Sequence, residues 1–580
     1  MKMKQALLGI AAMFVFVAAS ANAQTLQLAI IGSSAYYLEL GQASATAQTC
    51  YWTDSAKDLQ ATDSRIGKND GTSFWVTWSP GTGTCAAPAG SGALVNIYLS
   101  ADSVVGNRCF FGSPACTITL ASGVTETSLT TKAGSEVLGS NFNDTGTTLP
   151  TGVYSAIVGA SINAAATDIR PEDAEFAMNR VLTTCGTPMA TGSQYLGLGY
   201  SNGSVISSGT GSAGSVGNFN VGAFVLQGND PITGDAPTAN TSGGWTVTQI
   251  GAVPVVVFVN PSNASGFGSL LVSNIDRATL AGFLDGTYGR TSDVVDQAYS
   301  TASESPTTVF VREPISGTYN TMEYAIPNSV QNQSSQDVGV QAVNAFNAGL
   351  SVPPLFCTGG VGGTYGSLTM SLATARSHSG GSSYRVRAIG TGQEVASVLA
   401  GNANQANKDT LGYAFWSAAN FANATASNAK YLTVDGVDPL QEVWQDGLVP
   451  TAGNGLLGNV TLAHVKDGSY PIWSILRIVT STANKTVASN LVTEAANFLS
   501  PTQPDFVHAS TLTIVRSHFA PPGVNFTSAN GANSPCNGTN SACAESGGDV
   551  GGLVYSIQAD GDYNVDNSGA SGSGNVGHRQ

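Results

Sequence analysis

The sequence predicts an α/β protein whose sheets are at least partly parallel, and two observations support this class. Short apolar runs alternate with glycine-containing turns and helical segments, as at 26–31, 32–34 and 35–47. Hydrophobic residues make up 42% of the 580 residues while charged residues make up only 10%, so material for a large core is ample.

The same alternation continues along the chain. Residues 93–106 are predicted to be a strand that enters a serine-containing turn, and 155–182 a strand followed by a helix. The continuous apolar run at 253–260 predicts a further strand. The stretch 307–326 predicts a strand, a loop and a helix that begins at Ser316.

The N-terminal segment has the pattern of a signal peptide. Two lysines precede an apolar run at 6–19, and Ala21 and Ala23 fit a small-residue cleavage site, so the mature chain is expected to begin at Gln24. This pattern predicts a periplasmic or secreted protein.

Charge and motif content exclude several function classes. The net charge is −15 and no basic run occurs, so nucleic acid is not an expected partner. The five histidines have no metal-ligand spacing, and no catalytic residue, metal or cofactor is predicted. An acidic protein can still bind a small anion, since a buried pocket acts through local dipoles.

Eight cysteines, an even number, indicate disulfides in an oxidising compartment. Cys109–Cys116 and Cys536–Cys543 are close pairs that are each predicted to close a short loop. Cys50–Cys85 is a third candidate pair, which leaves Cys185–Cys357. Spacing alone leaves other pairings open.

A candidate oxyanion site begins at the helix predicted from Ser316. A helix N-terminus offers free backbone N–H groups and a partial positive charge, and Gly317 permits close approach of a ligand. Ser316 and Thr318 add hydroxyl groups, and Arg312 can form a bidentate contact with an oxyanion. An ordinary helix cap is the alternative interpretation of the Ser-Gly-Thr triplet.

Three other segments place polar groups where a strand meets a helix. They contain Ser34 with the backbone N–H of Ala35, then Ser103, and then Asp168. Four helix N-termini that bear hydroxyls, one carboxylate and one arginine, all after strands, fit a tetrahedral oxyanion site better than any one of them alone. The alternative is that Asp168 only caps the following helix.

These segments resemble the periplasmic phosphate-binding proteins of bacterial ABC transporters, in the type II periplasmic-binding-protein superfamily. The most specific match is Arg-x-x-x-Ser-Gly-Thr at 312–318; "IIGSSAYYLELGQA" and "ATDIRPEDA" are similar to two further ligand-binding segments. The resemblance implies two α/β lobes with a ligand cleft between them, at 24–250 and 251–479, and a return to the first lobe over 480–580. It implies ligand contacts from Ser34, Ala35, Ser103, Asp168, Arg312, Ser316, Gly317 and Thr318.

The implied function is capture of a small inorganic oxyanion, most simply phosphate, with an inner-membrane ABC permease as partner. Three alternatives stay open. They are a secreted surface or matrix protein that keeps the fold without transport, a binding protein for another anion or organic acid, and a hydrolase that uses Ser201.

Overall fold

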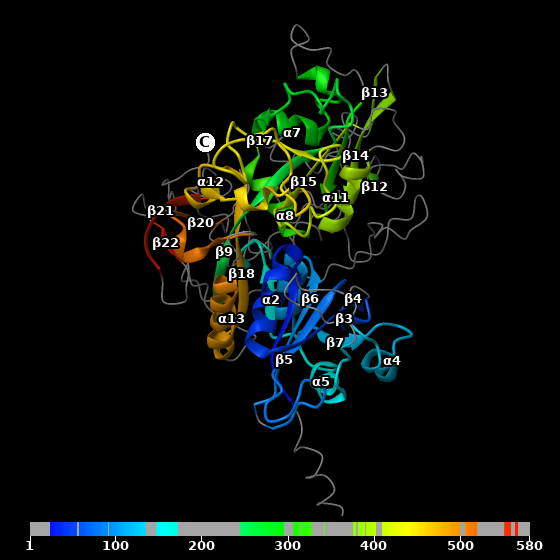
Figure 1. Ribbon diagram of the computed structural model, residues 1–580, viewed down its shortest axis with the longest axis vertical. Coiled ribbons are helices and arrows are strands. Elements are labelled where there is room, and N and C mark those ends of the chain that lie inside the picture. Colours follow the sequence, from blue (N-terminus) through cyan, green and yellow to red (C-terminus); the bar gives the residue numbers. More distant parts are fainter. Residues whose placement is uncertain are drawn as a thin grey trace, which may run out of the picture.

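The computed structural model describes residues 24–54, 57–65, 67–90, 92–134, 147–171, 174, 244–294, 306–313, 315–326, 341–342, 375–378, 381–388, 390–401, 409–498, 505–518, 550–557 and 563–565 (Figure 1). Two of the predicted cysteine pairs, Cys536–Cys543 and Cys185–Cys357, lie outside these residues, as does Ser201.

A mixed sheet of 14 strands forms the framework, so the predicted α/β class is confirmed. Its main path runs through β12 (Gln341–Ala342), β14 (Gly381–Ala388), β11 (Thr308–Arg312), β15 (Thr410–Phe415), β9 (Trp245–Val259), β18 (Trp473–Ser481), β8 (Ala164–Thr167), β1 (Thr25–Ser33), β6 (Leu94–Ala101), β5 (Phe74–Trp78) and β2 (Cys50–Asp54). Off this path, β13 (Ala375–His378) pairs with β14, and β16 (Lys430–Tyr431) and β19 (Val507–His508) pair with β9.

The large sheet contains both parallel and antiparallel strand pairs. β1 is parallel to β6 and β8, and β11 is parallel to β14 and β15. β9 is antiparallel to both of its main partners, β18 and β15. In Figure 1 the elements from β1 to β7 lie in the lower part of the view and those from α7 to α11 in the upper part, with β9 and β18 between them.

β9 changes its main partner at Pro254. Residues 245–254 pair with β18, and residues 255–259 pair with β15 on the other side of β9. Proline has no N–H for a ladder, which fits an exchange of neighbours at this position. Every residue of β9 is buried, as its apolar sequence predicts. The lobe boundaries predicted near 250 and 479 fall inside β9 and β18, and the division into lobes stays a prediction.

Three small sheets and nine α-helices complete the described structure. The small sheets join β10 (Asn274–Ile275) to β17 (Thr433–Val434), β4 (Lys68–Asp70) to β3 (Leu59–Asp63) and β7 (Thr117–Leu120), and β20 (Ile514–His518) to β21 (Val550–Ile557) and β22 (Tyr563–Val565). The helices are α2 (Tyr37–Gln48), α3 (Ser103–Phe111), α4 (Glu126–Thr130), α5 (Thr151–Ile157), α7 (Arg277–Asp285), α8 (Gly317–Ala325), α11 (Thr391–Ala400), α12 (Ala463–Lys466) and α13 (Lys485–Phe498).

Most predicted elements within the described residues are confirmed, with two local corrections, and the helix predicted after Asp168 lies almost wholly outside those residues. The helix predicted at 35–47 begins with a 3-10 turn, η2 (Ser34–Tyr36), before α2. The strand predicted from residue 155 is wrong at its start, because residues 155–157 belong to α5 and β8 begins only at Ala164. A short apolar run has no periodicity that separates a strand from a helix, so this error has a clear cause.

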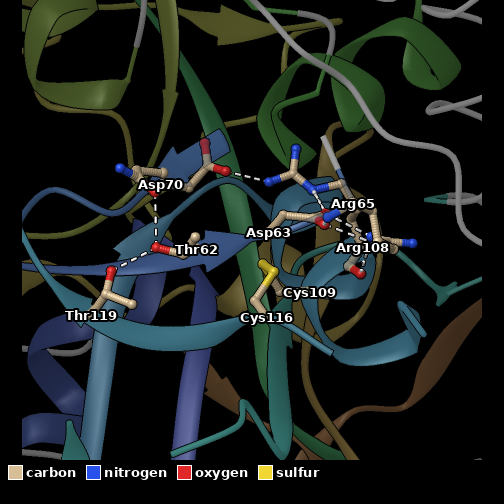
Figure 2. The surroundings of a disulfide bond; sticks show 9 residues. Thr62, Asp63, Arg65, Asp70, Arg108, Cys109, Cys116 and Thr119 are labelled. Atoms are coloured by element: carbon tan, nitrogen blue, oxygen red, sulfur yellow. Dashed lines mark hydrogen bonds and ion pairs between the residues drawn. A yellow bond between two sulfur atoms is a disulfide. The ribbon is translucent and has the colours of Figure 1, made fainter. Parts of the chain in front are cut away.

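Both predicted disulfides that fall within the described residues are confirmed, Cys50–Cys85 and Cys109–Cys116. Figure 2 shows the second beside an ion-pair network at the C-terminal end of α3. The buried Arg108 pairs with Asp63 at 3.2 Å and also with Asp70. These contacts fix α3 against β3 and β4, and therefore also fix the opposite end of α3, where Ser103 lies.

Candidate functional site

Three parallel strands end at the same edge of the large sheet. β1, β6 and β8 lie side by side, and Gly32 is opposite both Ser100 and Ala166. The residues that follow the strands therefore gather at this edge, as is general for ligand sites in α/β sheets. Ser33 and Asp168 are among them.

Asp168 lies buried at the centre of this edge. Its backbone N–H donates to the hydroxyl of Ser103 at 3.0 Å, and the hydroxyls of Ser33 and Ser103 hydrogen-bond its carboxylate. Burial raises the pKa of Asp168 to about 6, and those hydrogen bonds and the charges of Arg312 and Arg477 oppose the rise. Within the described part of the chain, Oδ1 of Asp168 is buried without a hydrogen-bond partner.

The N-terminus of α8 is in direct contact with Asp168. A Cβ placed on Gly317 would lie 2.3 Å from Oδ2 of Asp168 and 2.5 Å from the hydroxyl of Ser103, so glycine is required here. Ser316 is the N-cap of α8, and its hydroxyl accepts from the backbone N–H of Thr318 at 3.2 Å. The first turns of α3 and α8 thus both face the buried carboxylate.

Arg312 is held by a network of carboxylates and hydroxyls. It donates to the carboxylate of Glu313 at 2.9 and 3.0 Å and to Thr391 at 2.7 Å. Longer bonds of 3.3 and 3.4 Å reach Asp102 and Thr318. Burial opposes the charge of the guanidinium, but the charge and hydrogen bond of Glu313 outweigh burial and raise the pKa of Arg312.

Asp102 and Glu313 form a carboxyl pair beside Arg312. Burial and the charge of Glu313 raise the pKa of Asp102 well above its usual value. Burial would also raise the pKa of Glu313, but Arg312 lowers it, and the backbone N–H of Gly390 donates to both Glu313 oxygens at 3.0 and 3.1 Å. The proton that the pair shares therefore belongs to Asp102.

Ser34 and Ala35 directly follow Ser33, whose hydroxyl hydrogen-bonds the carboxylate of Asp168. The hydroxyl of Ser34 is 3.4 Å from that of Thr391, and the backbone N–H of Ala35 donates to Ser33 at 3.1 Å. The structure therefore brings Ser103, Asp168 and Gly317 into contact, and Arg312 donates to Thr318. Ser34 lies on the Arg312 side, through Thr391. Figure 1 shows α8 and α11 above β6.

Four side chains of this region were missed by the sequence analysis: Ser33, Asp102, Glu313 and Thr391. Three of them directly precede or follow a predicted residue, so a wider window around each strand end would have found them. Thr391 lies at the start of α11, far along the chain from Arg312. Only the fold brings Thr391 and Arg312 together, so no local sequence pattern could have identified Thr391.

A cavity of about 580 Å³ adjoins the Arg312 network. Ser34, Asp102, Glu313 and Thr391 belong both to its wall and to that network. The remaining lining residues are Tyr37, Leu38, Thr72, Ser73, Ser100, Ala101, Gly390, Gly392, Gln393, Ala419 and Asn420.

A second buried carboxyl pair lies next to this wall. Glu39 of α2 lies beside Asp505, and both of its carboxyl oxygens are buried without a hydrogen-bond partner in the described structure. The backbone N–H of Ala418 donates to Asp505 at 2.7 Å. Burial, followed by the charge of Asp505, raises the pKa of Glu39 well above its usual value. Over the described ranges no ion pair joins either carboxyl to a basic side chain, so the contact requires a proton.

Two features are absent from the described residues. No helix there combines the length and the apolar character that crossing a bilayer demands. No group of three or more His, Cys, Asp or Glu side chains in the same residues is arranged to hold a metal ion.

No protein-family model and no curated protein matches the sequence. Similar solved structures include a DING protein, which is 12% identical in sequence. The match covers 83% of this chain and 90% of the DING protein, with a TM-score of 0.32. A phosphate-binding protein from Stenotrophomonas maltophilia is 13% identical. The match covers 71% of this chain and 78% of that protein, with a TM-score of 0.28. An ABC-type phosphate transport receptor from Vibrio cholerae is 12% identical. The match covers 44% of this chain and 69% of that receptor, with a TM-score of 0.23. Similarity at this level places no ligand contact on this chain.

Proposed function

We propose that this chain binds a small inorganic oxyanion, most simply phosphate, at the edge where Asp168 meets the N-termini of α3 and α8. The observation that carries the proposal is the buried Oδ1 of Asp168, which has no hydrogen-bond partner in the described structure. A carboxylate acceptor between two helix N-termini suits a ligand that is anionic and also carries a proton.

Hydrogen phosphate has this combination of properties. Its O–H would donate to Asp168, while its other oxygens would accept from Thr318, from the α8 backbone at Gly317 and from Arg312. The bonds from Arg312 to Asp102 and Thr318 are long, at 3.3 and 3.4 Å, and are the ones that a ligand oxygen would replace.

The wider proposal concerns architecture and location. Two lobes, 24–250 with 480–580 and 251–479, would close over the ligand around β9 and β18. Disulfides at Cys50–Cys85 and Cys109–Cys116 favour a location outside the cytoplasm, where an ABC permease would receive the ligand. The role that we propose is binding without catalysis.

Competition between phosphate and sulfate tests the role of Asp168. Calorimetry should find phosphate binding to the wild type and no effective competition by sulfate, which would place a lone pair against the carboxylate. Asp168→Asn should narrow the difference between phosphate and sulfate affinity, because an amide can donate to either anion. The matched control is Asp467→Asn, an exposed aspartate in a surface turn that should leave the ratio unchanged.

Arg312→Ala should weaken phosphate binding by about 30-fold to several thousand-fold, the range for removal of one partner from a buried charged contact. Arg312→Lys should restore it only in part, because lysine lacks the planar fork. If the wild type binds no phosphate, the oxyanion proposal is wrong and a surface or matrix role becomes the better interpretation.

A further inference from the structure

The cavity beside the Arg312 network is much larger than a tetrahedral inorganic anion requires. Its volume of about 580 Å³ lies within the range of sites that enclose whole organic ligands, roughly 300–1,000 Å³. Thr391 lies in its wall and also accepts from Arg312 at 2.7 Å. Space for an organic group therefore begins directly beside the proposed anion site.

The wall of the cavity has the chemistry of a polyol site. Among the described residues that line it there is no lysine or arginine, so a second anionic group on the ligand would find no partner. Hydroxyls and amides dominate the polar lining, and the hydroxyl of Ser73 makes no hydrogen bond within the described structure. The carboxyl groups of Asp102 and Glu313 can accept from ligand hydroxyls, and the ring of Tyr37 adds an apolar face.

We propose that the ligand is a phosphomonoester of a polyol or sugar, whose phosphoryl group occupies the Asp168–Arg312 site and whose hydroxyl-bearing part occupies this cavity. The inference rests on the proposed oxyanion function and specifies its ligand class. It adds a role for Ser73, Gly392 and Asn420 of the wall, which the anion site itself does not use.

The proton balance of this complex gives an independent signature. A phosphomonoester loses its last proton near pH 6, and Asp168 also titrates at about 6. At neutral pH both groups are mainly ionised, so the complex must take up a proton to form the hydrogen bond between them. Inorganic hydrogen phosphate keeps one proton as the dianion and should take up less.

Gly392 allows the cavity to be filled without disturbing the anion site. It lies in the first turn of α11, and a Cβ there would meet no atom within 4 Å in the described structure. Gly392→Trp should therefore be tolerated and should occupy part of the cavity. Gly458 of η5 (Leu456–Asn459) is the matched control, since a Cβ there also meets nothing within 4 Å and Gly458 is not a lining residue.

Calorimetry with inorganic phosphate, glycerol 3-phosphate, glucose 6-phosphate, glycerol and glucose tests the inference. Near pH 6 we expect the two esters to bind at least about 10-fold more tightly than inorganic phosphate, a difference of about 1.4 kcal/mol. Gly392→Trp should remove this advantage and leave inorganic phosphate within about 2-fold of wild type, whereas Gly458→Trp should change neither. Measurements at neutral pH in buffers of different ionisation enthalpy should give greater proton uptake for the esters.

The outcomes separate the two proposals. If phosphate binds but the esters bind no more tightly, or Gly392→Trp affects both alike, the polyol inference is overturned and the oxyanion function stands. Tight binding of glycerol or glucose without a phosphoryl group also overturns the inference. If neither phosphate nor the esters bind, the proposed function itself fails.

Discussion

Replacing Arg312 with alanine should cost this protein much of its stability, because the guanidinium lies in a carboxylate network. The substitution removes two bonds to Glu313, of 2.9 and 3.0 Å, and leaves that buried carboxylate with the backbone N–H of Gly390. Loss of one partner from a buried ion pair costs about 3–5 kcal/mol of the free energy of unfolding. Burial and the charge of Glu313 raise the pKa of Asp102, so we expect this carboxyl to add less to the cost than Glu313.

The pH dependence of the loss follows from Glu313. Arg312 lowers the pKa of Glu313 in the folded protein, despite its burial, so this stabilisation is present above the unfolded pKa of about 4.3 and is lost as pH falls. The difference in the free energy of unfolding between wild type and Arg312→Ala should therefore be largest near neutral pH and should narrow below about pH 4.

Urea unfolding of wild type, Arg312→Ala and Arg277→Ala at several pH values would measure this gap. Arg277 pairs with Asp435 at 2.5 Å, but both side chains are partly exposed, so its removal should cost no more than about 1 kcal/mol. Equal losses for the two arginines, or a gap for Arg312→Ala that does not change with pH, would refute the reasoning.

Three further outcomes are expected. Because burial raises the pKa of Glu39 in the folded state, its contribution to stability is present at low pH and is lost as pH rises. Glu39→Gln stays neutral at every pH and should become increasingly more stable than wild type as pH rises. A difference in the free energy of unfolding by urea that stays constant between about pH 5 and pH 9 would contradict this. Gly317→Ala should cost about 1–3 kcal/mol by overpacking against Asp168 and should abolish phosphate binding, whereas Gly392→Ala should do neither when both are compared by urea unfolding and calorimetry. Discrimination against sulfate should be strong above about pH 6 and weak below it, since protonated Asp168 can donate to sulfate. If competition titrations give the same ratio of phosphate to sulfate affinity on both sides of pH 6, Asp168 does not determine the selectivity.

Local sequence patterns predicted the elements that carry the candidate site. The strand, loop and helix of 307–326 appear as β11 and α8, with Ser316 as the N-cap, because capping chemistry and apolar runs are local properties. The close cysteine pair 109–116 was predictable for the same reason. Gly317 was assigned a close approach to a ligand, and in the structure it also makes a close approach to Asp168.

The contacts that surround Arg312 could not be predicted in this way. Thr391 reaches Arg312 only because β11 is parallel to β14, the strand that precedes α11. The carboxyl pair of Glu39 and Asp505 likewise joins residues that no motif connects. Side chains of this kind depend on long-range packing, so their environments follow from the fold and not from sequence spacing.

The position of β18 has a consequence for how the chain folds. β18 lies between β8 and β9 and pairs with both, although it follows them far along the sequence. Until residues 473–481 have been synthesised, β8 and the 245–254 part of β9 lack their central neighbour and expose unpaired backbone groups. Contacts of such high sequence separation slow folding, since the loop must close before the pairing stabilises it. The large sheet can therefore be completed only late in synthesis, after residues 473–481 have emerged.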